Sequence, residues 1–402
     1  MKFTKISFLA LTAVFAATFT SCDNDDDTIP ANNVIAPTTY SFERNSQSSV
    51  SFSGQTTRIK MADEIAAALK NPSLTEGNID AMFAHVAGAN NFSDASLNAS
   101  GKSVRSKVAA STDFFAANST DAAAIQSEFD GFIADQANDV FPFWLNTATR
   151  GNAGQLQEAG GGAVRYMGPK GLEYDQAFVK GLIGSLMVDQ MLNNYLSTAV
   201  LDAGDYRIDN DNDVVATGKP YTNMEHKWDE AFGYLYGAEQ DATNPVLGVD
   251  QYLNKYLNRV EGSASFNGIA ATIYDAFILG RAAIVAKNYE VRDQQADIIK
   301  EEVSNIIGIR AVYYLQVAQN FLVADKATAF HDLSEGYGFI YSLQFTRKAG
   351  TNQPYFSKTE VDAYLAELMT GEGFWDVTPA TLDRISDEIS ARFEFTTAQA
   401  SI

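Results

Sequence analysis

The sequence predicts an all-α protein: a large helical bundle with an internal duplication and a small β-hairpin-like segment near its N-terminal end. After Gln55 the apolar residues recur with helical spacing almost without interruption, and such spacing is typical of amphipathic helices. A twelve-residue pattern that begins at His226 occurs again at His331. Because a repeated pattern indicates a repeated structural unit, we expect two related, pseudo-symmetric halves within one helical domain.

The first folded element is expected to be a hairpin. Tyr40 and Phe42, and then Val50 and Phe52, alternate with polar residues on either side of the segment ERNSQSS, which is a pattern of paired strands. After the hairpin, the spacing of apolar residues predicts helices near 56–70, 78–87, 102–117, 121–147, 172–203, 222–240, 248–260, 268–289, 293–323, 328–346, 358–369 and 380–394.

Several of these helices have recognisable first residues. Thr222 and Ser357 are each followed three residues later by glutamate, which is the pattern of a capping box, and Asp121 is predicted to be an N-cap. Glu225 belongs to the first of these boxes, so we expect it to have a structural role. The glycine-rich segment 159–174 is predicted to be a loop, and it lacks the Gly-Lys-Ser/Thr ending of a phosphate-binding loop.

The N-terminal residues indicate export to the cell envelope. Residues 1–21 contain lysines and then an apolar run that is too short for an ordinary membrane span, which is the layout of a secretory signal peptide. Cys22 follows small residues and resembles the lipidated cysteine of bacterial lipoproteins. The acidic stretch 22–38 reads as a flexible tether, and residues 39–402 as a single helical domain. We expect a lipid-anchored protein of the outer membrane, on its periplasmic or cell-surface side.

The composition disfavours several partners and chemistries. Lys and Arg total 29 against 50 Asp and Glu, so the net charge is −21. Nucleic acids and anionic lipid head groups are bound through basic residues, so we expect neither, and the membrane is reached through the lipid anchor alone. Cys22 is the only cysteine, which leaves the mature chain without disulfides or a thiolate site.

The repeat itself reads HKWDEAFGYLYG at 226–237 and HDLSEGYGFIYS at 331–342. At about 100° per residue, positions i, i+4, i+7 and i+11 of a helix share one face, and we call this face the polar stripe of each copy. The stripes consist of His226, Glu230, Gly233 and Gly237 in the first copy and of His331, Glu335, Gly338 and Ser342 in the second. Small residues allow another backbone to approach, so a pseudo-two-fold axis would bring both stripes together at the centre.

A metal site is the first hypothesis for these stripes. Imidazole and carboxylate groups one helical turn apart can bind one ion, and the absence of thiolates favours iron or zinc over a soft metal. The candidate ligands are His226, Glu230, His331 and Glu335, with Asp229 as a second-rank candidate because it lies one residue off the stripe.

A buried structural network is the second hypothesis. Each histidine–glutamate pair would hydrogen-bond within its helix and to charged residues that interrupt long apolar runs, namely Arg281, Arg310 or Asp189. Buried polar groups need such partners, because an unpartnered one costs about 1–3 kcal/mol. For each of these three charged residues taken alone, we expect a position at the edge of an apolar stripe, with the charge reaching solvent.

Hydrolysis is the third hypothesis. A zinc peptidase of the common kind would contain H-E-x-x-H, and an α/β-hydrolase would contain G-x-S-x-G; the sequence contains neither. The residues therefore favour a binding role over an enzymatic one.

Three segments also resemble a known family: TYSFERNSQSSVSFSGQTTRIKM (39–61), MEHKWDEAFGYLYG (224–237) and HDLSEGYGFIYSLQF (331–345). Together they look like an uncharacterised bacterial lipoprotein family, a domain of unknown function numbered 4856. More distantly, the chain is similar to imelysin-like proteins, which implies two related helical bundles, a link to iron acquisition and a doubtful peptidase label. By this resemblance His226 matches the histidine of the G-x-H-x-x-E motif. Met224 replaces its glycine and Asp229 its glutamate, and Ser334 stands at the glutamate position of the second copy.

These observations predict a lipid-anchored envelope binding protein that takes up a metal ion, iron or zinc, or a metal-bearing ligand during nutrient acquisition, with outer-membrane uptake proteins as partners. The alternative is a structural or partner-docking lipoprotein whose stripes form a buried hydrogen-bond network. A metal-dependent hydrolase is the third interpretation.

Overall fold

The computed structural model describes residues 34–239 and 241–402, and the residues from Val34 onward form one compact unit. The predicted signal peptide, the predicted lipidation site Cys22 and the predicted tether up to residue 33 lie outside the described residues. The unit is mostly helical, as predicted. No helix in the described part of the chain is long and apolar enough to cross a membrane.

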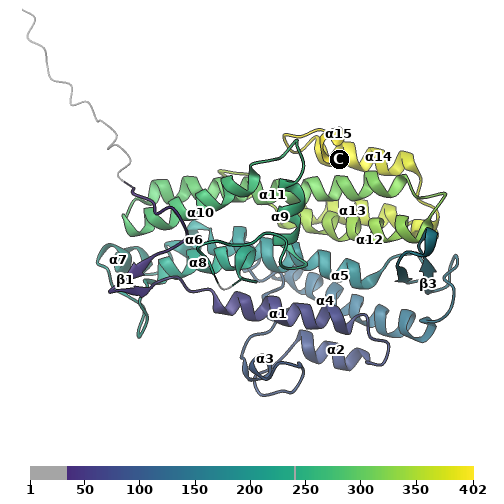
Figure 1. Ribbon diagram of the computed structural model, residues 1–402, viewed down its shortest axis with the longest axis horizontal. Helices are drawn as coiled ribbons and strands as arrows, with labels where there is room; N and C mark the ends of the chain where they lie inside the picture. The colour runs from purple at the N-terminus through teal and green to yellow at the C-terminus, as the bar shows by residue number, and fades with distance from the viewer. Residues whose placement is uncertain (1–33, 240) are drawn as a thin grey trace, which may run out of the picture. The chain divides into compact units, whose positions relative to one another are not determined.

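Three long helices follow one another along the chain (Figure 1): α10 (Ile269–Val285), α11 (Tyr289–Gln319) and α12 (Lys326–Ser342). Helix α11 packs against both α10 and α12. Gly336 permits the close contact of α11 and α12, because a Cβ at this position would lie 3.2 Å from the Cβ of Tyr314. Helix α14 (Pro379–Ser390) covers another side of α11.

The motif helices lie in different surroundings. Helix α8 (Asn223–Tyr236), which carries the first copy, packs against α1 (Ser53–Ala68) and α10, whereas α12 packs against α11 and α5 (Tyr174–Leu182). The remaining α-helices are α2 (Glu76–Phe83), α3 (Ala95–Ala99), α4 (Ser119–Asp135), α6 (Thr198–Leu201), α7 (Tyr206–Asp211), α9 (Leu253–Glu261), α13 (Lys358–Leu368) and α15 (Thr397–Ala400).

Two small antiparallel sheets complete the fold. The predicted N-terminal hairpin is confirmed, although its strands β1 (Glu43–Arg44) and β2 (Gln47–Ser48) pair within the segment ERNSQSS and not on either side of it. A second hairpin pairs β3 (Gly154–Gln157) with β4 (Val164–Met167), so the prediction of a loop throughout 159–174 was wrong. Strand β4 has only four residues, too few for its alternation to be recognised, and stacking of Tyr166 on Trp144 holds it against the bundle.

Three helix predictions also need correction. In the predicted helix 121–147, α4 ends at Asp135 and is followed by a π-helical turn (η2, Gln136–Val140) and a 3-10 turn (η3, Phe141–Phe143). The segment 102–117 contains a 3-10 turn at Arg105–Lys107 instead of a helix, because Ala109 has φ +46° and the next two N–H groups donate to Asp189. The predicted helix 172–203 consists of α5, two π-helical turns (η5, Ile183–Val188; η6, Met191–Tyr195) and α6.

The start of α4 differs from prediction as well. The helix follows Asn118, and Asp121 lies in its first turn, so Asp121 is not the N-cap. The capping boxes at Thr222 and Ser357 are confirmed.

The three charged residues within apolar runs are all buried, so the expectation that they lie at stripe edges was wrong. Asp189 accepts hydrogen bonds from the backbone N–H groups of Ala110 and Ser111 at 3.1 and 3.0 Å. The guanidinium of Arg310 lies over the ring of Tyr313, 3.9 Å from its centroid. Buried charges persist only when they are paired or hydrogen-bonded; Arg281 meets this condition within the network described next.

Candidate functional site

Each motif copy brings a second helix close to the glycine of its polar stripe. A Cβ at Gly233 would lie 2.4 Å from the Cβ of Phe52 and 3.1 Å from that of Gln55, at the start of α1. A Cβ at Gly338 would lie 2.4 Å from the Cβ of Lys180, on α5. Distances below 3 Å exclude any side chain larger than hydrogen, so both glycines are required by the packing.

The residue that approaches each glycine also binds the glutamate of the same stripe. Gln55 donates a hydrogen bond to Glu230 at 3.2 Å, and Lys180 forms an ion pair with Glu335 at 3.3 Å. The two copies therefore share one arrangement. One residue from a neighbouring helix places its Cβ against the glycine of the stripe. The polar end of the same residue binds the glutamate that lies three positions before that glycine.

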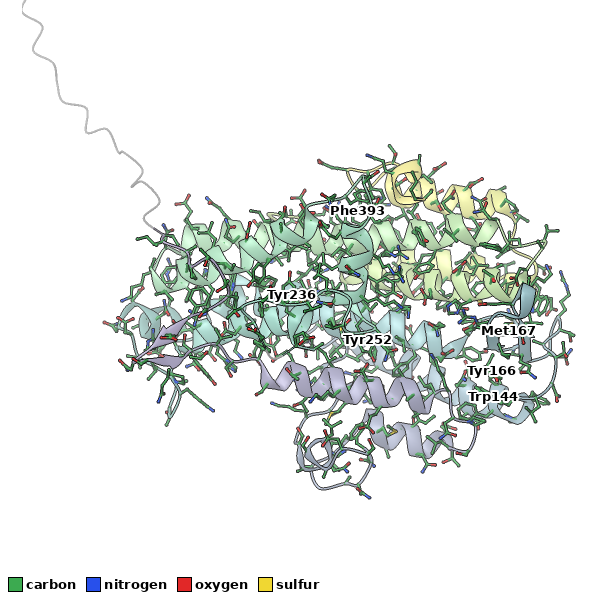
Figure 2. All side chains as sticks on the ribbon, in the orientation of Figure 1. Trp144, Tyr166, Met167, Tyr236, Tyr252 and Phe393 are labelled. Carbon is green, nitrogen blue, oxygen red and sulfur yellow. The ribbon has the colours of Figure 1, made fainter. Side chains whose placement is uncertain are left out.

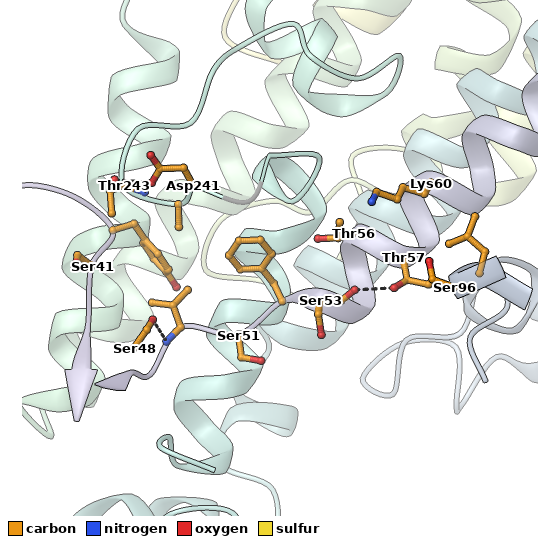
Figure 3. Close-up of a pocket in the computed structure, with 15 residues that line it drawn as sticks. Ser41, Ser48, Ser51, Ser53, Thr56, Thr57, Lys60, Ser96, Asp241 and Thr243 are labelled. Carbon is orange, nitrogen blue, oxygen red and sulfur yellow. Dashed lines mark hydrogen bonds between the residues drawn. The ribbon is translucent and has the colours of Figure 1, made fainter. Parts of the chain in front are cut away.

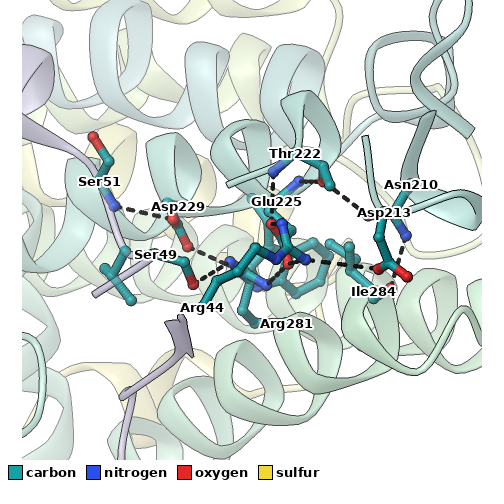
Figure 4. A network of polar contacts seen from close by, with 12 residues as sticks. Arg44, Ser49, Ser51, Asn210, Asp213, Thr222, Glu225, Asp229, Arg281 and Ile284 are labelled. Carbon is teal, nitrogen blue, oxygen red and sulfur yellow. Dashed lines mark hydrogen bonds and ion pairs between the residues drawn. The ribbon is translucent and has the colours of Figure 1, made fainter. Parts of the chain in front are cut away.

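The first copy contains a buried network of charges that lies beside its polar stripe (Figure 4). Arg281 of α10 is fully buried and donates to Asp229 at 3.1 Å and to Glu225 at 3.0 Å. Asp229 also accepts hydrogen bonds from the Tyr40 hydroxyl at 2.7 Å and from the backbone N–H of Ser51 at 3.0 Å. The network thus ties α8 and α10 to the N-terminal hairpin.

Glu225 has a second guanidinium partner and a backbone role. Arg44 of β1 donates to both of its oxygens, at 3.1 and 3.2 Å. In the predicted capping box, Glu225 accepts from the N–H of Thr222 at 2.6 Å, and the Thr222 hydroxyl accepts from the N–H of Glu225 at 3.2 Å. Glu225 therefore completes the capping box and also binds the guanidinium groups of two arginines.

Burial controls the ionisation of Asp229. Its loss of solvent raises the pKa to about 6, although Arg281 and the hydrogen bonds of Tyr40 and Ser51 lower it. Asp229 is consequently charged at neutral pH and paired with a guanidinium. Because both partners of this hydrogen bond are ionised, it is stronger than a hydrogen bond between neutral groups.

The stripe residues of the first copy are engaged more loosely. Glu230 accepts from Lys227 at 2.7 Å in addition to Gln55. The ring of His226 stacks on Tyr221 with centroids 4.6 Å apart, and its Nδ1 has no hydrogen-bond partner among the described residues. Burial lowers the pKa of His226, with partial compensation from Glu230.

The second copy places its histidine between two carboxylates. Nδ1 of His331 lies 3.1 Å from Oε2 of Glu173, and Nε2 lies 3.6 Å from Oε1 of Glu335. Burial lowers the pKa of His331, but Glu173 and Glu335 raise it more, so the net pKa is raised. Burial likewise raises the pKa of Glu335, but Lys180 and His331 outweigh it and hold it at about 2.

Helix α12 also holds the backbone of Glu173, which directly precedes α5. The N–H of Glu173 donates to the Ser334 hydroxyl at 2.9 Å, three residues after His331 in the same helix. The second motif copy thus fixes both the main chain and the side chain of Glu173. Only one carboxylate oxygen is used, since Oε1 of Glu173 has no hydrogen-bond partner within the described part of the chain.

A cavity of about 370 Å³ adjoins this residue. Its lining includes Glu173, Gln136, Lys70, Arg165 and the stacked pair Trp144 and Tyr166, and we call it the Glu173 cavity. Figure 2 shows Trp144 and Tyr166 close together, where α4 is followed by the second hairpin. The second motif copy is therefore close to a space that a small ligand can occupy.

A larger cavity of about 520 Å³ lies beside the N-terminal hairpin (Figure 3). Serine and threonine hydroxyl groups dominate its lining, together with Phe52, Lys60 and Asp241. Ser51, which lines this cavity, donates its backbone N–H to Asp229 and so connects the cavity wall to the buried network.

The two polar stripes have separate sets of partners, so the structure does not bring His226 and Glu230 together with His331 and Glu335. Among the described residues, no group of three or more His, Cys, Asp or Glu side chains is arranged to hold a metal ion. Of the predicted supporting residues, Arg281 joins the first copy through Glu225 and Asp229.

The other two supporting residues differ in their relation to the motif. Arg310 reaches the second copy through Tyr256, whose ring it covers and whose hydroxyl donates to Glu335 at 3.2 Å. Asp189 binds the segment at Ala110 and Ser111 instead.

Comparison with known proteins identifies the family and no activity. Residues 37–396 match the family described as Domain of unknown function (DUF4856). The chain therefore belongs to this family, which its motif segments predicted. No curated protein and no solved structure matches the chain significantly.

Sequence reasoning missed Glu173, Lys180 and Arg44. Glu173 and Lys180 come from a segment about 150 residues before the second motif copy, and Arg44 from the hairpin. A local pattern could not connect them to the motif. The one available signal was the acidic residue at the end of the glycine-rich segment, immediately before a helix.

Proposed function

We propose that this protein is a lipid-anchored binding protein of the cell envelope, in which the arrangement shared by the two motif copies is structural. The observation that carries the structural role is the buried contact of Arg281 with Asp229 and Glu225. Anchoring through Cys22 and location at the outer membrane rest on the N-terminal sequence.

The energetics favour a network over a metal site in the first copy. A metal ion at Asp229 would have to displace the buried guanidinium of Arg281, which would keep only Glu225 as a carboxylate partner, and breaking a buried ion pair costs about 3–5 kcal/mol. The acceptor positions of Asp229 are also occupied by Tyr40 and Ser51. The first copy is therefore proposed to join the hairpin, α8 and α10.

A metal ion is a second candidate for the other copy. His331 lies between Glu173 and Glu335, and imidazole with carboxylates suits iron or zinc. Lys180 competes for Glu335 and would have to move. Uptake proteins of the outer membrane would then be partners. The third interpretation, a hydrolase, would need the same ion together with a water molecule bound beside it.

Metal content separates these candidates. The soluble form without residues 1–22, purified without affinity metal, would be subjected to elemental analysis beside His226→Ala and His331→Ala. The proposed structural role predicts no stoichiometric iron or zinc and an unfolding temperature that does not respond to either metal. Stoichiometric metal that is lost in His331→Ala alone would establish the second candidate, and loss in both variants would contradict the structural role of the first copy.

The anchor is tested independently by growing cells with labelled palmitate. The full-length chain is expected to incorporate the label and Cys22→Ser to lose it. Unchanged labelling of Cys22→Ser, or an unlabelled wild-type chain, would contradict lipid anchoring at this residue.

A further inference from the structure

We propose that the Glu173 cavity binds a small molecule through an ammonium or guanidinium group whose N–H groups donate to Glu173 and Gln136. The inference rests on the proposed binding role and specifies the ligand class. A cavity of about 370 Å³ is in the range of small-ligand sites.

Two residues of the cavity lining each carry a buried acceptor atom that has no donor among the described residues. Gln136 is fully buried, and its amide nitrogen donates to the carbonyl of Leu69 at 2.8 Å, which fixes Oε1 as the remaining acceptor. Oε1 of Gln136 and Oε1 of Glu173 have no hydrogen-bond partners among the described residues. A buried acceptor without a donor is costly, and two in one lining are matched by a group that carries several N–H donors.

The charges of the lining identify that group as a cation. Lys70 pairs at 3.5 Å with Asp175, which also lines the cavity, and Arg165 pairs at 2.6 Å with Glu158, which does not. Glu173 is left with His331, which occupies one of its oxygens. An ionised carboxylate that is 3% exposed gains most from a positively charged donor at the other oxygen.

Burial raises the pKa of Glu173 in the present structure, and the hydrogen bond and charge of His331 only partly oppose this. A cation at the free oxygen would favour the ionised form, as His331 already does. The carboxyl group is therefore poised for a second positive partner.

The aromatic pair supplies the apolar side of the site. Trp144 and Tyr166 stack with centroids 3.5 Å apart and rings inclined by 7°, and both line the cavity. Aromatic faces accommodate alkyl stems and attract cations. A ligand with a short alkyl chain ending in ammonium or guanidinium satisfies both sides of the cavity.

His331 and Ser334 are positioning residues for this site. They hold the side chain and the main chain of Glu173 at 3.1 and 2.9 Å, respectively, from one face of α12. This gives the second motif copy a role in binding that does not require a metal.

The test is calorimetric titration of the full-length chain in detergent with agmatine and putrescine, and with choline as a matched cation without N–H donors. Agmatine or putrescine is expected to bind at least about tenfold more tightly than choline, since a hydrogen bond to a charged group contributes about 1.5–3 kcal/mol. Glu173→Gln is expected to weaken binding of the same probe about tenfold or more.

Glu230→Gln is the control variant, because Glu230 is a partly buried glutamate of the first copy with its own partners; binding should stay within about twofold. Trp144→Leu removes the aromatic wall but keeps the carboxylate, and should weaken binding even if Glu173→Gln folds poorly.

Absence of binding by both amines at millimolar concentration would overturn the inference. Choline binding as tight as agmatine, or full affinity in a folded Glu173→Gln, would also overturn it. Palmitate labelling and metal analysis do not depend on this cavity, so its failure leaves the proposed function intact.

Discussion

The two copies of the motif share their helix packing but differ in how their carboxylates are satisfied. In the first copy, Glu225 and Asp229 are enclosed by the guanidinium groups of Arg281 and Arg44. In the second, the stripe glutamate Glu335 pairs with Lys180, much as Glu230 pairs with Lys227 in the first, and His331 links Glu335 to a second carboxylate, that of Glu173, beside a cavity.

This difference distinguishes the motif residues that serve helix packing from those whose partners differ between the two copies. The glycine and the glutamate of each stripe receive a neighbouring helix in the same way. The residues around them, contributed by α10 and the hairpin in one case and by α5 in the other, determine whether the carboxylates meet a guanidinium or a histidine. A repeated sequence therefore indicates repeated packing more strongly than repeated function.

The largest expected effect comes from removing the buried guanidinium of the first copy. Arg281→Met leaves Asp229 and Glu225 buried with fewer counter-charges, and breaking a buried pair in this way costs about 3–5 kcal/mol. We expect the free energy of unfolding, measured by urea denaturation, to fall by that amount.

The control for this prediction is Arg384→Met. Arg384 pairs with Glu388 on the surface, where its side chain is 43% exposed, and exposed pairs contribute about 0–1 kcal/mol. An Arg281→Met variant as stable as Arg384→Met would show that the first copy does not depend on its network.

The two copies should also respond to pH in opposite directions. The pKa of Glu335 is lowered from 4.5 to about 2 in the folded protein, so its contribution is present above pH 4.5 and is lost as the pH falls toward 2. The pKa of Asp229 is raised from 3.8 to about 6. The folded state then binds this proton more tightly, and stability increases as the pH falls from 6 to 3.8.

Each of these contributions is on the order of 3 kcal/mol. Urea denaturation across pH 3–7 should show that the stability of wild type relative to Glu335→Gln decreases in acid below pH 4.5. Relative to Asp229→Asn, wild type should gain stability between pH 6 and 4. Parallel trends for the two variants would contradict the assigned environments.

A smaller effect, and one that should be similar in both copies, is expected from the glycines. Gly233→Ala and Gly338→Ala each place a Cβ 2.4 Å from another Cβ, and such overpacking costs about 1–3 kcal/mol. Gly131→Ala in α4 is the control, since nothing lies within 4 Å of its Cβ position, and it should stabilise the helix by about 0.5–1 kcal/mol. If either motif variant has the same thermal unfolding temperature as wild type, the glycine of that copy is not required for packing.

The elements that could be predicted from the sequence are those encoded by local patterns. The apolar spacing of α10, α11 and α12 and the capping boxes at Thr222 and Ser357 depend on residues within a few positions of one another. The adjacency of His331 and Glu335, one turn apart, was predictable for the same reason.

The remaining features depend on contacts between distant segments. The helix expected at 102–117 is replaced by a turn because Asp189, about 80 residues later, caps its backbone. Glu173 reaches His331 across 158 residues. Arg281 is buried because Asp229 and Glu225 accept from it, whereas its apolar surroundings alone suggested a position at the edge of a stripe.

The most direct test of the difference between the copies is the titration of the histidines by NMR. The chain has three histidines, and substitution of each in turn by glutamine assigns their ring signals. Burial lowers the pKa of His226, whereas Glu173 and Glu335 raise that of His331 above 6.5. We expect His331 to titrate above pH 6.5 and His226 below it, with the His331 value falling in Glu173→Gln. Equal values, or a higher value for His226, would contradict the account of one histidine held mainly by burial and one flanked by two carboxylates.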